Sequence, residues 1–369
     1  MVISASLSRV VVLAALLAAC YIAFDMMQTP QPLIIGGRAS EFADEFISVT
    51  GDEKMVEDVP VEEKTTEKPP SRRPSSLCMA SFFIIGARKG GTTSLYEYIS
   101  SHPGVYGVKL AAGPQAGELF YVERHSVNTD NVDAVKKWRD GYDKVVMKRM
   151  VEKAVPFDSA KHLTGESSVG TSTGCASAKK LLAACGPNIK ILYLARDPVE
   201  QMISRFRMRV RLQTAGYSSR TPINPVLRKQ LNKAQKLTRG LDADWYKNTD
   251  KCVFSGYKNG AWNSLHVVHL ERFLNAFGEE NMLVRKSEDF FREPAAVVRE
   301  AYNFLGLDAG AVDVDKIVAK VYNEGTTKQK HSEIQTLDED LRKDLRAFFA
   351  PYNRALSSTW GIDINEWEK

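Results

Sequence analysis

A glycine-rich loop between a short apolar run and an amphipathic stretch constrains the fold of this chain most strongly. Residues 82–85 read Phe-Phe-Ile-Ile, which is typical of a buried strand, and residues 86–94 read Gly-Ala-Arg-Lys-Gly-Gly-Thr-Thr-Ser. Apolar residues then recur at helical spacing, and we predict that this helix stops near His102 because Pro103 follows. Backbone N–H groups of such a loop and of a helix N-terminus attract anions, so the segment predicts an anion-binding site.

The loop differs from the Walker A motif of nucleotide hydrolases in the position of its lysine. Gly86 and Gly91 have the spacing of Gly-x-x-x-x-Gly-Lys-Ser/Thr, but Thr92 stands at the lysine position and Lys89 lies upstream. This displacement argues against an ATP or GTP hydrolase, which needs its lysine beside the β- and γ-phosphates. A plain turn of an α/β protein is the simpler alternative, but the Lys-Gly-Gly-Thr-Thr-Ser string contains more than a turn requires.

A second segment has the features of a strand that ends at a phosphate site. Residues 189–195 read as a buried parallel strand, and a helix-like stretch follows. Asp197 suits the N-cap of that helix and Pro198 suits its first position. Arg196 then lies at the carboxyl end of a strand, where open α/β sheets bind ligands. Ser204 lies about two turns into the helix, so it and Arg196 are expected to reach one phosphate.

The N-terminal residues predict a targeting segment and a stem. Residues 10–24 form an uninterrupted apolar run, somewhat shorter than the ~20 residues of a full bilayer span. We assign residues 1–27 to an uncleaved signal anchor or a cleaved signal peptide, and Leu-Ala-Ala-Cys at 17–20 leaves a lipoprotein signal as a third alternative. Residues 28–76 are rich in Pro, Thr, Ser, Glu and Lys, which predicts a disordered acidic stem.

Residues 77–369 are predicted to form the folded domain, which is basic although the whole chain has a net charge of only +5. A one-signed basic run beside the second segment suits an acidic polymer such as a sulfated or uronate-bearing glycan, and a solvated face is the alternative. Nucleic acid suits the charge equally, but no base-stacking aromatic pattern accompanies it, so we expect no nucleic-acid partner. The run contains Arg205, Arg207, Arg209, Arg211, Arg220, Arg228, Lys229, Lys233, Lys236 and Arg239.

Both segments resemble the motifs of sulfotransferases that use 3′-phosphoadenosine 5′-phosphosulfate (PAPS). Residues 83–95 are similar to the 5′-phosphosulfate loop of that family, and residues 194–204 are similar to its 3′-phosphate segment. The order and spacing of the motifs hold over about residues 80–367. Further stretches resemble the Golgi carbohydrate branch, the heparan sulfate type especially; they are residues 263–274, 281–284 and 348–356.

The resemblance implies a PAPS site without a metal. Lys89 would be catalytic and contact the leaving oxygen and the sulfuryl group, and Arg196 and Ser204 would hold the 3′-phosphate. Lys328 and Lys330 lie where the family has a basic loop that closes on the cofactor. The 5′-phosphate would be held by Gly90, Gly91, Thr92, Thr93 and Ser94. No metal-ligand spacing is visible among the six histidines.

Sulfuryl transfer to a hydroxyl needs a general base, and the resemblance points to Glu118. The related enzymes use a Glu in a Lys-Glu-x-His-Phe-Phe-like string; residues 117–121 read Gly-Glu-Leu-Phe-Tyr, which keeps the Glu and replaces the Lys and His. A solvated charge at a strand edge is the alternative for Glu118. Glu166 is the second choice of base and is expected to line the acceptor site. Arg205, Arg209 and His266 are also expected to contact the acceptor, although packing within a helix is the simpler alternative for His266.

The five cysteines are too few for a disulfide scaffold. Cys175 and Cys185 flank a run of helix formers and would be ~15 Å apart in a helix, which exceeds the ~7 Å that a bridge allows between Cα atoms. We therefore expect that they do not pair with each other. Cys78 and Cys252 are left as a pair that can form.

The sequence thus predicts a single P-loop-like α/β domain, with a mostly parallel sheet flanked by helices, behind a membrane anchor and a flexible stem. Our leading hypothesis is a Golgi sulfotransferase, single-pass type II with a lumenal domain, that sulfates a hydroxyl or amine of a carbohydrate, and we expect this carbohydrate to be anionic. Secretion or lipid anchoring after signal cleavage is the alternative location. Alternative functions are a non-catalytic PAPS- or glycan-binding relative, a sulfotransferase acting on a lipid or small alcohol and, least favoured, a P-loop nucleotide kinase.

Overall fold

The computed structural model describes the chain in six stretches: residues 76–109, 117–214, 216–248, 260–320, 322 and 336–369. The apolar run at 10–24 and nearly all of the predicted stem lie outside these residues. Among the helices of the described stretches, none has the length and apolar character needed to cross a bilayer. The signal anchor therefore stays a prediction from the sequence.

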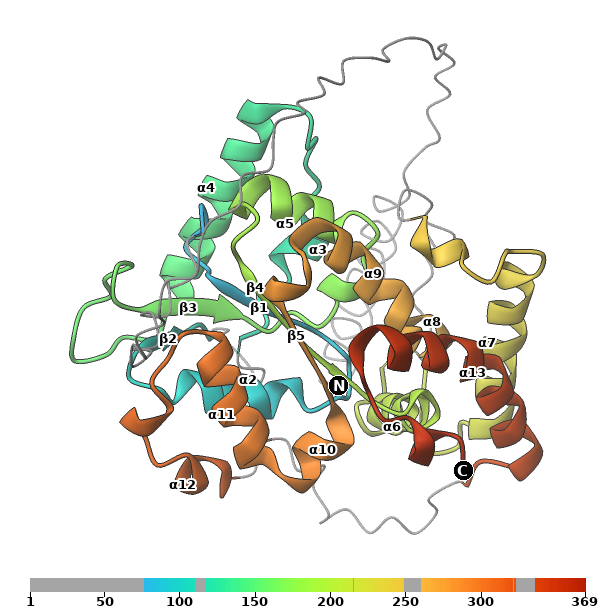
Figure 1. Ribbon diagram of the computed structural model, residues 1–369. Coiled ribbons are helices and arrows are strands. Elements are labelled where there is room, and N and C mark those ends of the chain that lie inside the picture. Colours follow the sequence, from blue (N-terminus) through green and yellow to red (C-terminus); the bar gives the residue numbers. More distant parts are fainter. Residues whose placement is uncertain (1–75, 110–116, 215, 249–259, 321, 323–335) are drawn as a thin grey trace, which may run out of the picture. The chain divides into compact units, whose positions relative to one another are not determined.

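The described residues form one five-stranded sheet with the strand order β2-β3-β1-β4-β5, and every neighbouring pair is parallel (Figure 1). The strands predicted at 82–85 and 189–195 are β1 and β4 and lie side by side. The predicted α/β domain with a parallel sheet is thus confirmed. The strand bounds are β1 Phe82–Gly86, β2 Val105–Gly107, β3 Leu163–Glu166, β4 Lys190–Ala195 and β5 Met282–Lys286.

Helices pack on both faces of the sheet (Figure 1). One face carries α2 (Thr92–Ser100), α10 (Ser287–Arg292) and α11 (Pro294–Phe304). The other face carries α4 (Val132–Arg149), α5 (Ser177–Cys185) and α9 (His266–Phe277). The remaining helices are α3 (Tyr121–Arg124), α6 (Pro198–Arg211), α7 (Ile223–Thr238), α8 (Gly260–Asn263), α12 (Val314–Val318) and α13 (Glu339–Trp360).

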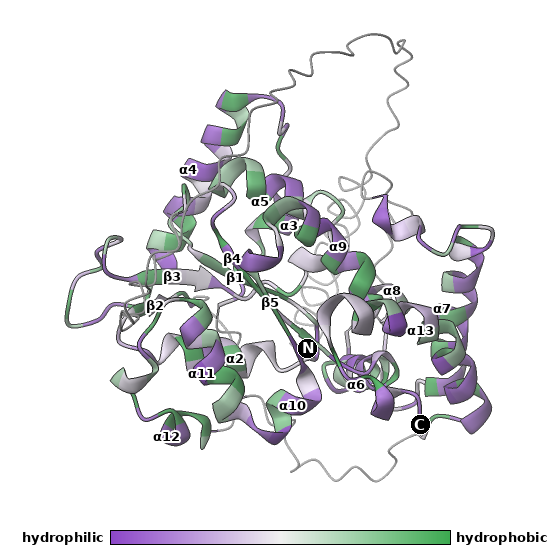
Figure 2. Cartoon of the chain, in the orientation of Figure 1, coloured by the Kyte–Doolittle hydropathy of each residue, from purple (hydrophilic) through white to green (hydrophobic). Residues whose placement is uncertain are grey.

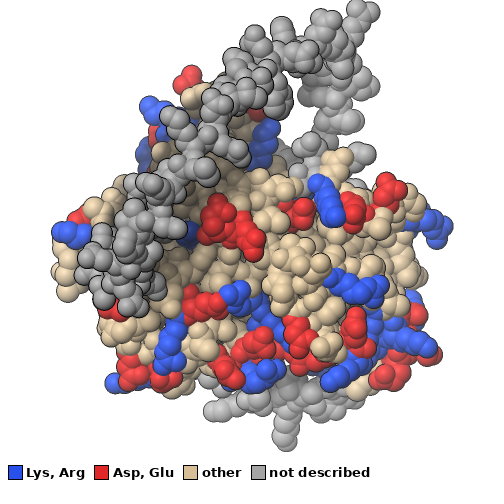
Figure 3. Space-filling view, viewed as in Figure 1, with Lys and Arg blue, Asp and Glu red and all other residues tan. Residues whose placement is uncertain are grey.

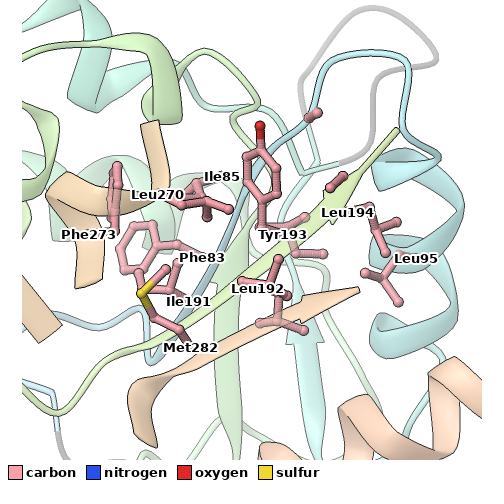
Figure 4. Packing of buried hydrophobic residues seen from close by; sticks show 14 of the residues in the cluster. Phe83, Ile85, Leu95, Ile191, Leu192, Tyr193, Leu194, Leu270, Phe273 and Met282 are labelled. Carbon is pink, nitrogen blue, oxygen red and sulfur yellow. The ribbon is translucent and has the colours of Figure 1, made fainter. Parts of the chain in front are cut away.

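The core explains why β1, and β4 after its first residue Lys190, are almost entirely apolar. Both strands have helices on each side, so side chains that point in either direction are buried. Phe83 lies against Phe273 of α9, whereas Leu194 lies against Leu95 of α2 (Figure 4). The strands are correspondingly hydrophobic in Figure 2, while α7 and α11 combine hydrophobic and hydrophilic residues. The central strands are therefore held from both sides, which fixes the ends where the two predicted motifs begin.

The helix boundaries at both motifs agree with the sequence. α2 ends at Ser100, just before Pro103. At the start of α6, the Asp197 carboxylate accepts hydrogen bonds from the N–H groups of Val199 and Glu200, at 2.8 and 3.3 Å, and Pro198 is the first helical residue. The predicted N-cap and first position of this helix are confirmed.

One cysteine expectation is wrong. Cys78 is disulfide-bonded to Cys185 and not to Cys252, and Cys175 is disulfide-bonded as well. Cys78 precedes β1 and Cys185 precedes β4. Because these neighbouring strands are parallel, the residues that enter them meet at the same edge of the sheet. The expectation that Cys175 and Cys185 do not pair with each other is confirmed.

Candidate functional site

The loop between β1 and α2 has the backbone shape of an anion site. Lys89 has φ 67° and Gly91 has φ 95°, so two residues of this short loop adopt left-handed geometry. At Gly91 a Cβ would also lie 2.8 Å from Phe291 Cε1, and at Gly90 a Cβ would lie 2.8 Å from the Leu194 carbonyl oxygen. Gly91 is the N-cap of α2 and has no side chain to receive the first helical N–H groups. The loop therefore directs backbone donors toward a ligand.

The hydroxyl of Ser94, in the first turn of α2, is engaged by the protein. It donates to the Tyr322 carbonyl oxygen at 3.1 Å, which brings the chain at residue 322 beside the loop. Thr92 is buried and Thr93 is half-buried at the same helix start. The predicted cofactor residues Lys328 and Lys330 lie outside the described residues.

Arg196 joins the second motif to the loop. Its Nη1 donates to the Lys89 carbonyl oxygen at 2.7 Å, and its guanidinium lies 5.6 Å from the centre of the Phe291 ring. Ser204 is half-buried on α6, two turns after Pro198. The structure therefore brings Arg196 and the lysine loop together at the carboxyl edge of β1 and β4, which is the edge where the sequence placed the anion site.

His266 of α9 contacts two residues at this edge, Arg196 and Tyr193. It is 2% exposed, its Nε2 lies 2.7 Å from the Arg196 carbonyl oxygen, and its Nδ1 lies 2.8 Å from the Tyr193 hydroxyl. Burial lowers the pKa of His266 to about 4, so the ring is neutral near pH 7. A neutral ring donates through one nitrogen only, which must be Nε2 because a carbonyl accepts, and Nδ1 then accepts from Tyr193. We propose that His266 positions Arg196 instead of contacting the acceptor.

Replacing His266 by Phe keeps the ring volume and removes both hydrogen bonds. We expect the free energy of unfolding to fall by about 1–3 kcal/mol, because buried polar groups of Tyr193 and Arg196 lose their partner. Urea denaturation measures this loss, and calorimetry should find weaker binding of adenosine 3′,5′-bisphosphate. His125 is exposed, so His125→Phe is the control. Equal stability of the His266→Phe and His125→Phe proteins would contradict the positioning role.

Glu118, Lys89 and Arg88 form the charged centre of the site. Burial raises the pKa of Glu118 to about 7; Glu123 raises it further, while Arg88 and Lys89 oppose the rise. Burial also lowers the pKa of Lys89, assisted by Arg211 and Arg196 and opposed by Glu118. Within the described residues, no hydrogen bond or ion pair engages these three side chains. A carboxyl and a lysine are thus held near each other, half-buried and available to a ligand.

Glu166, the last residue of β3, is 1% exposed and contacts Leu119, the residue after Glu118. Its carboxylate accepts hydrogen bonds from Ser168 Oγ at 2.6 Å, Tyr142 OH at 3.2 Å and the Leu119 N–H at 3.3 Å. Burial is the main cause that raises the pKa of Glu166 to about 8. Since all three donors belong to the protein, we propose that Glu166 positions the residue next to Glu118 and does not itself contact the acceptor.

Glu123 on α3 is a site residue that the sequence reasoning missed. One of its oxygens accepts a hydrogen bond from Thr171 Oγ1 at 3.0 Å, and a Cβ at Gly170 would lie 2.9 Å from both that oxygen and Arg88 Nη2. The negative charge of Glu123 contributes to the raised pKa of both Glu118 and Glu166. No spacing in the sequence indicates this role, because Glu118 lies before α3 and five residues do not share a helix face.

Arg205 and Arg209 of α6 extend the positive side of the site. Burial lowers the pKa of Arg205 to about 9, and the neighbouring charges of Arg88 and Arg209 lower it further. Arg209 stacks over Tyr217, with its guanidinium 5.3 Å from the ring centre. The structure therefore brings both predicted acceptor residues toward the loop arginine. Several like charges close together favour a ligand that carries negative charge.

A parallel sheet with a glycine loop at the end of one strand and an arginine at the end of the next defines a P-loop-type α/β protein that holds an anionic nucleotide or a related group. Within the described stretches, no cluster of three or more His, Cys, Asp or Glu side chains is arranged to hold a metal ion. The chain belongs to the sulfotransferase domain family, whose sequence model matches residues 80–360.

Curated relatives are distant. The chain is 20% identical over 319 residues to carbohydrate sulfotransferase 15 of Mus musculus, a match that covers 79% of this chain but only 55% of the relative. It is 24% identical over 343 residues to heparan sulfate glucosamine 3-O-sulfotransferase 3B1 of Mus musculus, which covers 86% of this chain and 74% of that protein. The chain thus spans about half the length of the first of these relatives.

A solved structure supports the fold. The crystal structure of a sulfotransferase from Alicyclobacillus acidocaldarius matches with a TM-score of 0.53 and 24% sequence identity. The match covers 79% of this chain and 99% of that chain. At this identity the likeness establishes the shared fold and no more.

Proposed function

We propose that this protein transfers a sulfuryl group from PAPS to a hydroxyl or amine of a carbohydrate. The observation that carries the proposal is the pair Lys89 and Glu118. Lys89 lies in the loop between β1 and α2, and Glu118 is close enough that the charge of each side chain shifts the pKa of the other. Within the described residues, no hydrogen bond or ion pair engages either side chain. Family membership and the carbohydrate acceptors in the relatives' names support the same reaction.

The residues of the loop fit the donor. Backbone N–H groups of Gly91 and the first turn of α2 suit its 5′-phosphate, whereas the Gly90 N–H already donates to the Ala87 carbonyl oxygen at 3.0 Å. Arg196 and Ser204 would hold its 3′-phosphate, and Lys328 and Lys330 would close on the donor. The fit rests on the two left-handed residues of the loop and on the uncapped start of α2. When bound, the donor supplies an activated sulfuryl group on a phosphate leaving group.

Glu118 acts as the general base of the reaction and Lys89 as the stabilising cation. Glu118 takes the proton of the acceptor hydroxyl as the acceptor oxygen bonds to sulfur and the bond from sulfur to the phosphate oxygen breaks. The Lys89 ammonium stabilises the negative charge that develops on the sulfuryl and leaving oxygens. A pKa of Glu118 of about 7 suits a base that works near neutral pH.

We propose an anionic glycan as the acceptor. Arg205 and Arg209 lie on α6 beside Arg88. Their positive charges repel one another, and a negative group bound between them would offset this repulsion. A sulfate or carboxylate on a sugar near the reacting hydroxyl would relieve that repulsion. A neutral acceptor, such as a small alcohol or an uncharged lipid, would not.

We further propose that the enzyme works on the secretory side of the cell, as a single-pass Golgi membrane protein with a lumenal domain. The apolar run at residues 10–24 supports this location. The Cys78–Cys185 disulfide also supports it, because disulfides persist in oxidising compartments.

Calorimetric titration with adenosine 3′,5′-bisphosphate tests the donor site directly, with ADP as the matched control ligand. We expect the bisphosphate to bind at least ~100-fold more tightly, which corresponds to ~2.8 kcal/mol, because Arg196 and Ser204 recognise the 3′-phosphate. Equal binding of the two nucleotides would contradict the PAPS site and favour a nucleotide kinase. Tight bisphosphate binding without sulfate transfer to any glycan would favour a non-catalytic relative.

A further inference from the structure

A cavity of about 510 Å³ lies between α13 and the last described residues of the chain, and none of the proposed catalytic or donor residues lines it. Its volume is within the range of pockets that hold small ligands. Two glutamates, Glu339 and Glu368, belong to the lining. The basic side chains outnumber them; they are Arg342, Lys343, Arg346, Arg354 and Lys369. Over the side where α13 and α7 lie, Figure 3 shows blue side chains interspersed with red ones.

Three polar groups in the lining have no partner within the described residues. Arg346 Nε and Trp367 Nε1 are buried and make no hydrogen bond. Both are donors only, so an acceptor oxygen is the one kind of atom that satisfies them. Asn353 is 5% exposed, and its side-chain amide makes no hydrogen bond. Buried polar groups are normally paired, so this cluster indicates a ligand rich in oxygen atoms.

Two of the lining cations already have structural roles. Arg342 pairs with Glu200 at 2.9 Å, and Arg346 lies 4.0 Å from Asp197, so both hold the first turn of α6. Lys343 and Arg354 are exposed and form no ion pair within the described residues. A ligand can therefore recruit these two residues, and the exposed lining residue Lys369, without loosening the fold.

We propose that this cavity is a second saccharide-binding site that takes a sulfate or carboxylate group of an acidic sugar. The charged group meets Lys343 and Arg354, and the sugar oxygens meet Asn353, Arg346 and Trp367. The choice of a saccharide rests on the proposed function, whereas the choice of an oxyanion rests on the cavity itself. The site holds another part of the glycan, away from the reacting hydroxyl.

The test measures binding of a sulfated heparan sulfate disaccharide by calorimetry and locates it by hydrogen exchange. We expect slower exchange in α13 when the disaccharide is present. The Lys343→Ala/Arg354→Ala protein should bind it at least ~10-fold more weakly at this site and lose the protection of α13. Lys136→Ala/Lys137→Ala, which removes two exposed lysines of α4, is the matched control and should behave as the parent.

Three comparisons decide whether the proposal holds. Equal protection of α13 in the parent and in the Lys343→Ala/Arg354→Ala protein would overturn the proposal, as would no protection in the parent. Protection by inorganic sulfate equal to that by the disaccharide would overturn the saccharide and leave a simple oxyanion site. Adenosine 3′,5′-bisphosphate binding is measured for each protein: if it fails while α13 is protected, the proposed function fails and the cavity site stands.

Discussion

Replacing Lys89 by Ala should lower kcat for sulfuryl transfer by about 10²- to 10³-fold, the usual cost of removing a group that stabilises transition-state charge. The positive charges of Arg211 and Arg196 lower the pKa of Lys89, so both residues lie near it. The Arg196 guanidinium already donates to the Lys89 carbonyl oxygen and stacks on Phe291. Arg196 is thus poorly placed to substitute for Lys89. The measurement is the rate of adenosine 3′,5′-bisphosphate release from PAPS with heparan sulfate as the trial acceptor.

The same protein should also bind PAPS more weakly, because the lysine contacts the donor before the reaction as well as during it. Lys136→Ala removes an exposed lysine far along the chain and serves as the control. If the Lys89→Ala protein binds PAPS and turns it over as the parent does, Lys89 is not the stabilising cation and the proposed mechanism fails.

Replacing Glu118 by Gln should lower kcat/KM by about 10²- to 10⁴-fold, the range expected for loss of a general base. The pKa of Glu118 is raised to about 7, and only the ionised carboxylate accepts a proton. In the parent, kcat/KM should therefore rise with pH through about 7 and level off above it. Gln cannot titrate, so this limb of the pH profile should disappear.

The pH profile separates a base from a residue that only shapes the site. Glu152 is exposed, and Glu152→Gln should keep both the rate and the limb near pH 7. A Glu118→Gln protein that is slow but keeps that limb would assign the titration to another group. Glu166 is then the first to examine, because its pKa is raised to about 8.

The local parts of the fold and site were predictable from the sequence. The glycine loop, the Asp197 cap and the strand before Arg196 are all encoded within a few neighbouring residues, so spacing alone placed them. Glu118 was predicted through the resemblance, since one carboxylate in a changed string carries little signal by itself.

The parts that the sequence did not predict depend on distant partners. The hydrogen bond between Tyr193 and His266 joins residues 73 apart, and the Glu166 bonds reach back 47 residues to Leu119. Nothing near His266 or Glu166 in the sequence indicates those contacts, so the sequence predicted neither set of hydrogen-bond partners. The Cys78–Cys185 bond spans 107 residues, and only the adjacency of β1 and β4 explains it.

That bond has a mechanical consequence. Cys78 stands just ahead of β1, the strand that leads into the lysine loop, and it is covalently joined to the end of α5. A pull on the chain before residue 78 is therefore transmitted through sulfur to α5 and the start of β4. We therefore expect that such a force does not separate β1 from the sheet, and that the conformation of the loop after β1 is retained.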